Sequence, residues 1–234
     1  MAYVGTVTLH DAEGHELVSR RYTALPHEGP EVIVKRIMAD VRAYRDQRPD
    51  LHLAVLQDGA PELWNAVRPA LSVVTKTWDE AIDRFHLEER LGEALGLLPI
   101  DSTERRRLWE AWTQRLDQDD DAIDAIESTL RAWHGKLAPA AAGKLWEHLV
   151  YLRNNKDRMR YASLLRKGLP VGSGITEAAC KSVVGQRTAG SGQRWHDEGL
   201  AAALTLRALH RSERLPRFWE HFARLYTRDV RMAA

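Results

Sequence analysis

Strand-type and helix-type hydrophobic patterns are segregated along this chain of 234 residues, and this segregation limits its fold more than any other feature. Residues 2–10 alternate and are rich in β-branched side chains, and residues 16–24 are expected to form a partner strand. Turn residues at 11–14 separate the two segments, which predicts a hairpin. From about residue 87 to residue 166, apolar residues recur at helical spacing and no strand is predicted. We therefore expect an α/β protein that contains an all-helical segment.

The segment between the hairpin and the helical segment is expected to alternate between helices and strands. The expected elements are a helix at 30–46, a strand at 51–56, a helix from Pro61, a strand at 72–77 and helices from Trp78 onward. The apolar run at 51–56 is nearly continuous, which is typical of a strand buried on both faces of a sheet. Asp58 and Gly59 follow it, at the end of the strand where α/β sheets commonly build their sites.

The composition is that of a soluble globular chain, with 44% hydrophobic and 29% charged residues. No apolar run approaches the roughly 18 residues that span a membrane, and the first residues do not resemble a secretory signal. Cys180 is the single cysteine, which excludes an intrachain disulfide framework and a zinc site of several thiolates. These observations predict a cytoplasmic protein without a membrane partner.

Charge is segregated although the formal net charge is only +1. Residues 117–127 are acidic, whereas the basic residues between 158 and 194 are Arg158, Arg160, Arg166, Lys167, Lys181, Arg187 and Arg194. Glu177 is the only acid between residues 158 and 194. Two interpretations follow: Glu177 is a functional acid beside a polyanion, or it is a first-turn glutamate that the helix dipole favours, followed by a solvated basic face.

The stretch 168–195, GLPVGSGITEAACKSVVGQRTAGSGQRW, resembles the C-terminal catalytic block of bacterial insertion-sequence transposases, most closely the ISKra group. These are DDE enzymes with an RNase H-like fold, in which a G-S-G-x-x-E stretch presents the last acid of the metal-binding triad. The segment that runs from Gly172 to Glu177 matches that stretch. The similarity extends over nearly the whole chain, and the 168–195 block is its most specific part.

The resemblance implies roles for two acids. On residue type alone, Asp58 before a glycine is most simply a turn residue. The family places its second catalytic acid after this strand, often before a glycine, which makes Asp58 a catalytic residue together with Glu177. The two carboxylates would then bind Mg²⁺ or Mn²⁺ for phosphoryl transfer, because hard cations take oxygen ligands.

Asp83 and His86 form an Asp-x-x-His stretch that is similar to a signature found after the second acid in related transposases. At positions i and i+3 they share a helix face, and the resemblance places them near the active site. The alternative is an ordinary pair on a helix surface.

Four residues near Glu177 are expected to contact DNA: Lys181, Arg187, Arg194 and Trp195. The lysine, four residues after Glu177, is either an intrahelical partner of that acid or a phosphate contact. The two arginines would hold the DNA backbone. The tryptophan would stack on an unpaired base or, alternatively, pack in the core.

The resemblance also predicts a domain organisation. Residues 1–86 would form the first part of an RNase H-like mixed sheet, 87–166 a helical insertion, and 167–234 the C-terminal part of the core. In the family, the first catalytic acid lies on a strand upstream of the hairpin, and this strand is central in the sheet. This chain begins at the hairpin, so we expect that strand and acid to be absent and open sheet edges to remain.

Three functions are compatible with these expectations. The first is a C-terminal portion of a transposase, whose family cleaves and transfers DNA strands but whose activity would here be impaired by the incomplete triad. The second is a non-catalytic fragment that binds DNA or regulates a transposase, and the third is a decayed gene product that folds poorly. The partners would be transposon ends and target DNA in the bacterial nucleoid, and self-association into a homo-oligomer is compatible with this role.

Overall fold

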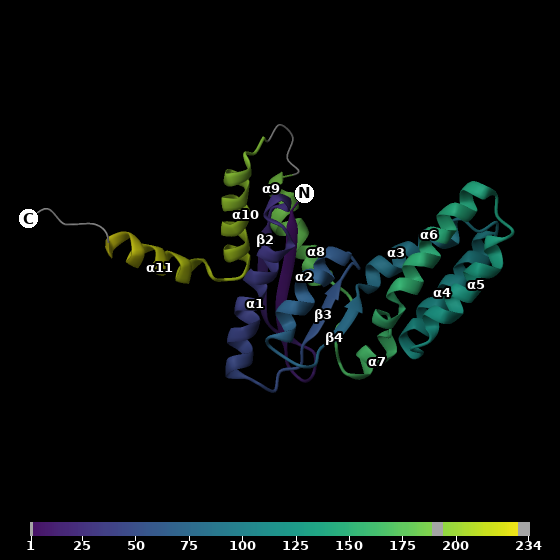
Figure 1. Cartoon of the computed structure of the whole chain (residues 1–234), viewed down its shortest axis with the longest axis horizontal. Helices are drawn as coiled ribbons and strands as arrows, with labels where there is room; N and C mark the ends of the chain where they lie inside the picture. The colour runs from purple at the N-terminus through teal and green to yellow at the C-terminus, as the bar shows by residue number, and fades with distance from the viewer. Residues whose placement is uncertain (1, 189–193, 229–234) are drawn as a thin grey trace, which may run out of the picture. The chain divides into compact units, whose positions relative to one another are not determined.

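The computed structural model describes residues 2–188 and 194–228, and the chain divides into two compact units. The first unit comprises Met1–Leu51, Asn65–Val74 and Gly174–Ala234, and the second comprises His52–Trp64 and Thr75–Ser173. Each unit contains one pair of strands surrounded by helices (Figure 1). The chain is therefore a mixed α/β protein, as the sequence predicts.

The first unit is organised around the predicted hairpin. Strands β1 (Tyr3–His10) and β2 (Glu16–Ala24) pair antiparallel, which confirms the hairpin. Helix α1 (Pro30–Gln47) begins where the sequence predicts, directly after a glycine with φ of +81°. Its apolar side chains Ile33, Val34 and Met38 are buried, because one face of an amphipathic helix turns toward the core.

The C-terminal part of the chain completes the first unit. Its elements are α8 (Gly174–Ala179), the π-helix η3 (Cys180–Gly185), α9 (Gln186–Thr188), α10 (Asp197–Arg211) and α11 (Leu215–Arg228). Helix α10 packs on β2, and both arginines of that strand, Arg20 and Arg21, donate hydrogen bonds to Ser212 just after the helix. The core here contains Leu25, Val183, Leu204 and Ala208.

The second unit contains a parallel strand pair. Strands β3 (Ala54–Gln57) and β4 (Asp79–Ile82) run parallel, and Gln57 is paired with Ile82 at their carboxyl ends. Helix α2 (Pro61–Ser72) provides most of the connection between them and runs from the second unit into the first. The short 3₁₀ turns η1 (Pro26–Glu28) and η2 (Lys156–Arg158) lie in the first and second units respectively.

Two details of the strand prediction are wrong. The strand expected at 72–77 is instead the end of α2 and a turn, and the strand forms at Asp79–Ile82, where a helical pattern was expected. Val73 and Val74 favour strand geometry locally, but pairing with β3 decides the position. Strand β3 is half-buried and not buried on both faces as expected, and among the described residues it pairs with β4 alone.

The rest of the second unit is helical. Its helices are α3 (Arg84–Gly96), α4 (Ser102–Gln118), α5 (Ala122–His134), α6 (Pro139–Asn155) and α7 (Tyr161–Arg166). Helix α5 packs against both α4 and α6 (Figure 1), and the buried side chains of these three helices include Leu116, Ile126, Leu130, Leu145 and Leu149. The predicted helical insertion at residues 87–166 stays a prediction, because the division into two compact units does not show which segment is inserted into the other.

Candidate functional site

Two aspartates follow the paired ends of the parallel strands. Asp58 comes directly after Gln57, and Asp83 comes directly after Ile82. The backbone N–H of Asp83 donates to the carbonyl of Gln57 at 2.9 Å, which continues the strand pairing by one step. The two aspartates are therefore neighbours at the carboxyl edge of the pair, where ligand sites of parallel sheets are usually built.

Asp58 lies in a turn and its side chain is exposed. Its Oδ1 atom accepts a hydrogen bond from the backbone N–H of Ala60 at 3.0 Å, a typical aspartate turn that leads into α2. Gly59 has a φ of +95°, and a Cβ atom there would come within 3.1 Å of Ile82, so a glycine fits this position. The hydroxyl of Tyr151 donates to the Asp58 carbonyl at 3.2 Å and fixes the turn from the helical side.

Asp83, in contrast, is buried, with only 1% of its surface exposed. It is the N-cap of α3, and four hydrogen bonds converge on its carboxylate. The donors are the backbone N–H groups of Phe85 and Ser173, both at 3.1 Å, the Nδ1 atom of His86 at 3.0 Å and the hydroxyl of Ser173. Burial raises the pKa of this carboxyl, but the hydrogen bonds from Ser173 and His86 outweigh it, so the pKa lies below its ordinary value.

His86 lies at the solvent side of this cluster. Its side chain is 41% exposed, while its Nδ1 atom is hydrogen-bonded to the carboxylate of Asp83. A carboxylate can only accept hydrogen bonds, so Nδ1 carries a proton, and in the neutral form of the ring the lone pair would lie on Nε2. The predicted Asp83–His86 pair is thus in direct contact, and the carboxylate selects the tautomer of the imidazole.

Ser173 is the member of this cluster that sequence reasoning missed. It belongs to the Gly-Ser-Gly stretch, where attention falls on the acid that follows, and its partner Asp83 is 90 positions away. The backbone N–H of Arg84 donates to the carbonyl of Val171 at 2.9 Å, so residues 171–173 lie along the start of α3. The buried hydroxyl of Tyr161 donates to the carbonyl of Ile82 at 3.0 Å and holds the end of β4.

Glu177 belongs to the first unit, whereas Asp58 belongs to the second. It is half-buried in α8, and the neighbouring Thr176 contacts Thr6 of β1 through their hydroxyls at 2.8 Å. No hydrogen bond or ion pair engages the Glu177 carboxylate among the residues that the structure describes. Burial, and then the charge of Glu177, raise the pKa of the Cys180 thiol.

The residues expected to contact DNA have different environments. Lys181 is exposed in η3 but forms no ion pair with Glu177 within the described part of the chain. Lys181 lies in a π-helix that begins at Cys180, whereas Glu177 lies in α8, so the two do not share one regular α-helix. Arg194 is exposed and Trp195 is half-buried, whereas the side chain of Arg187 lies outside the described residues.

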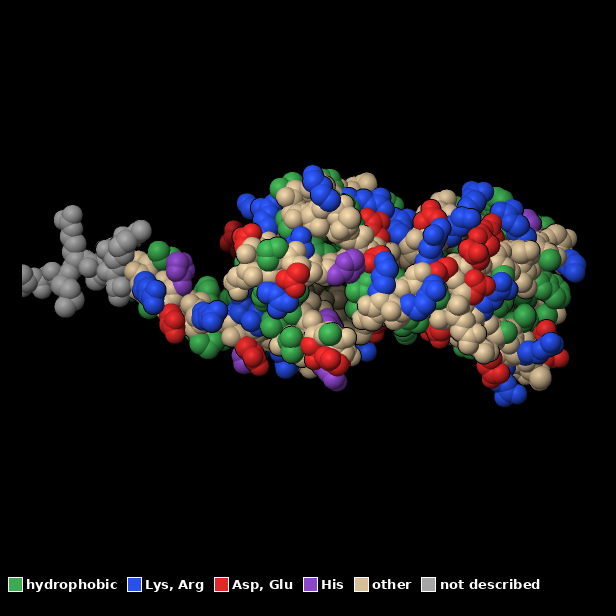
Figure 2. Space-filling view, turned by 90° about the horizontal axis from the view of Figure 1, so that it is seen from below, with side chains coloured by type: hydrophobic (Ala, Val, Ile, Leu, Met, Phe, Trp, Pro, Cys, Tyr) green, Lys and Arg blue, Asp and Glu red, His purple; other side chains and the backbone are tan. Residues whose placement is uncertain are grey.

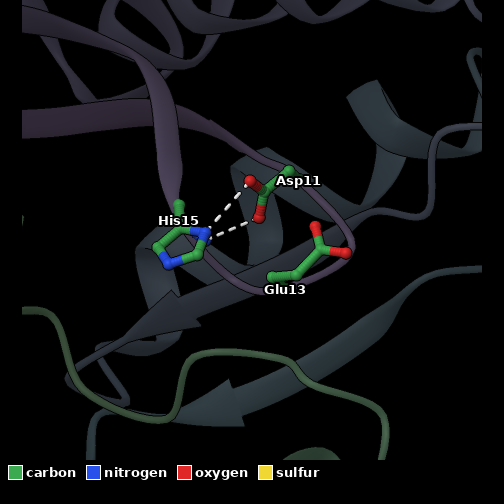
Figure 3. Close-up of side chains that lie close together, drawn as sticks. All are labelled: Asp11, Glu13 and His15. Atoms are coloured by element: carbon green, nitrogen blue, oxygen red, sulfur yellow. Dashed lines mark hydrogen bonds and ion pairs between the residues drawn. The ribbon is translucent and has the colours of Figure 1, made fainter.

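A further group of possible metal ligands lies in the turn of the hairpin. Asp11, Glu13 and His15 have ligand atoms within 4.8 Å of one another (Figure 3). Asp11 accepts hydrogen bonds from the backbone N–H and the Nδ1 atom of His15, at 2.8 and 3.1 Å. All three lie at the surface, and these bonds close a tight turn, so turn geometry alone accounts for the cluster.

Acidic and basic side chains are interspersed over the face of the molecule shown in Figure 2. Basic residues there do not form a continuous surface, in spite of the segregation in the sequence. Among the helices described, none combines the length and apolar character needed to cross a membrane.

Comparison with known proteins does not assign the chain to a family. No model of a protein family matches it, and no curated protein or solved structure is found to be similar to it. The site must therefore be interpreted from its own residues.

Proposed function

We propose that the chain is the C-terminal portion of a DDE-type transposase with an RNase H-like fold, in which Asp58 and Glu177 bind a divalent metal for DNA strand cleavage and transfer, an activity that the incomplete triad impairs. The observation that carries the proposal is the position of Asp58, directly after a parallel strand and before a glycine of positive φ. The G-S-G-x-x-E stretch that ends at Glu177 supports it, because the acid there has no other described partner.

The strand arrangement is compatible with this fold. An antiparallel hairpin is followed by a parallel pair, and in an RNase H-like sheet a further strand lies between two such pairs. Among the described residues, β1 pairs with β2 alone and β3 with β4 alone, so each pair keeps an edge that can accept another strand. A single RNase H-like sheet is part of the proposal.

The acids present fit a hard divalent cation such as Mg²⁺ or Mn²⁺. Asp58 uses one carboxylate oxygen in its turn and is exposed, and Glu177 is engaged by no described donor. Asp83 does not fit as a ligand, because four donors already occupy its two oxygens. When bound, the metal would supply charge neutralisation at the phosphate, and the chain's own task is to hold the two carboxylates in place.

The test is nicking of supercoiled plasmid DNA in the presence of Mg²⁺ or Mn²⁺. Asp58→Asn and Glu177→Gln should each abolish metal-dependent nicking, because each removes a ligand charge without changing side-chain size. Asp157→Asn, at an aspartate that is 83% exposed, is the matched control and should leave nicking unchanged. If both variants still nick DNA in a metal-dependent way, the assignment of Asp58 and Glu177 as metal ligands is wrong.

The alternative is a non-catalytic DNA-binding protein, and the exposed Lys181 and Arg194 favour it. It predicts binding to duplex DNA that needs no divalent metal and weakens as salt rises, since bound phosphates release counterions. Fluorescence anisotropy with labelled DNA at two salt concentrations measures this. Binding that does not change with salt would exclude the alternative. Both functions imply DNA as the partner and association with the bacterial nucleoid.

A further inference from the structure

The cluster around Asp83 has features that the proposed pair of acids does not use. A buried carboxylate holds a half-exposed imidazole by one nitrogen, and the same carboxylate holds residues 171–173 through Ser173. Histidines that bind metals almost always donate their other ring N–H to such a carboxylate or to a carbonyl, which fixes the tautomer and orients the ring. The cluster has this arrangement at His86.

His86 and Asp58 come from the same edge of the parallel strand pair. Asp58 and Asp83 follow a registered pair of residues on strands that are about 4.8 Å apart. His86 is three residues beyond Asp83 at the start of α3, a step of about 5–6 Å on a helix. The two side chains therefore belong to the same edge of the strand pair, where a carboxylate oxygen and an imidazole nitrogen can share a metal.

We propose that His86 is a metal ligand through Nε2, next to Asp58, and that Asp83 is the positioning residue that orients it. The inference rests on the proposed metal-dependent function and specifies the class of metal. Imidazole binds transition metals better than Mg²⁺, so a site of one carboxylate and one imidazole takes Mn²⁺ in preference to Mg²⁺. Water and substrate oxygens fill the remaining positions.

The experiment measures Mn²⁺ and Mg²⁺ binding to the whole chain by calorimetry. We expect wild-type protein to bind Mn²⁺ more tightly than Mg²⁺, and His86→Ala to remove this preference. Asp83→Asn should weaken Mn²⁺ binding about 10- to 100-fold, as loss of a group that orients a metal-binding histidine does elsewhere. Electron spin echo modulation of bound Mn²⁺ should show a nitrogen ligand in wild-type protein and none in His86→Ala.

Two controls separate positioning from general stability. Asp120 accepts hydrogen bonds from the backbone N–H and the hydroxyl of Ser163, as Asp83 does from Ser173, but it has no histidine partner among its described contacts. Asp120→Asn should therefore leave Mn²⁺ affinity unchanged. His15→Ala should also leave it unchanged, since that residue belongs to the hairpin turn. Because His86 is partly exposed, His86→Ala tests the ligand even if Asp83→Asn fails to fold.

The outcomes separate this inference from the function on which it rests. If Asp58→Asn and Glu177→Gln weaken Mn²⁺ binding but His86→Ala does not, the acids bind the metal and the role of His86 is wrong. If wild-type protein shows no nitrogen ligand to Mn²⁺, the role of His86 is also wrong. If wild-type protein binds no divalent metal at all, both proposals are wrong. Loss of binding in His15→Ala alone would assign the ion to the hairpin turn.

Discussion

The hairpin turn and the end of β4 contain the same residue types in opposite environments. In the turn, Asp11 accepts hydrogen bonds from His15 with its side chain 30% exposed, whereas Asp83 accepts from His86 with 1% exposed. The partners of Asp11 are within four residues, while Asp83 also binds Ser173, which is 90 positions away. The pairs differ because long-range donors, and not the Asp–His contact itself, make a buried carboxylate stable.

The largest expected difference between the two regions is in stability. Asp83→Ala leaves buried donors from Ser173 and Phe85 without an acceptor and should lower the free energy of unfolding by about 2–4 kcal/mol. Asp11→Ala, in which water replaces the lost acceptor, should leave stability unchanged. Guanidinium unfolding followed by circular dichroism measures both. Equal midpoints for the two variants would contradict the comparison.

The pH dependence of stability should next report on the Asp83 cluster itself, because the carboxyl of Asp11 in the hairpin turn also has a lowered pKa. The pKa of Asp83 lies below its ordinary value of 3.8, so the unfolded chain takes up this proton first as pH falls. The stability that Asp83 contributes is therefore complete above about pH 5 and is lost as pH falls through its lower folded-state pKa. Unfolding free energies measured from pH 6 to pH 2 should fall less steeply in Asp83→Asn than in wild-type protein. If the two curves of unfolding free energy against pH are parallel, the protonation of Asp83 is not coupled to folding.

Two tyrosines extend the comparison to the two ends of the parallel strands, because Tyr161 contacts the end of β4 and Tyr151 contacts the Asp58 turn. Tyr161 is buried and donates to the carbonyl of Ile82, so Tyr161→Phe should cost about 1–2 kcal/mol of unfolding free energy. Tyr151 makes a longer bond to the Asp58 carbonyl near solvent, and Tyr151→Phe should cost less than about 0.5 kcal/mol. The same denaturant titration ranks them. The reverse order would show that the Asp58 turn is held more firmly than the end of β4.

The last expected effect is local. Ser173→Ala removes one of four donors to Asp83 and should cost about 1 kcal/mol or less. Hydrogen exchange of residues 171–173 should become faster, because their attachment to α3 weakens. Ser163→Ala, the matched change beside Asp120, should not alter hydrogen exchange at residues 171–173. Faster exchange at 171–173 in both variants would indicate a general loosening of the second unit.

Local patterns predicted much of the secondary structure correctly. The hairpin and α1 were predicted nearly residue for residue, because strand alternation, turn residues and a proline at the helix start are local signals. The strand at 79–82 was missed, since its four residues, Asp-Glu-Ala-Ile, carry no strand pattern. Pairing with β3 places it, and local propensity cannot report a pairing partner.

The candidate site shows the same division. Residue type alone did not select Asp58, Asp83 and His86, because an aspartate before a glycine is most simply a turn residue and an Asp-x-x-His spacing is common on helix surfaces. The resemblance to transposases selected them. Ser173 was not selected as part of the same cluster, since its contact with Asp83 depends on how the chain returns to the end of β4. Whether Asp58 and Glu177 share a metal stays a prediction.

By itself, the sequence determined which residues carry ionisable groups, where the hairpin turns, and which segments are amphipathic helices. The tertiary structure decided that Asp83 is buried and saturated by donors while Asp58 stays exposed. Both are aspartates that follow a strand, so no local rule separates them. The difference arises because residues 171–173 fold back over one strand end and supply donors to it, and the free energy of a carboxylate depends on such neighbours more than on its own position in the chain.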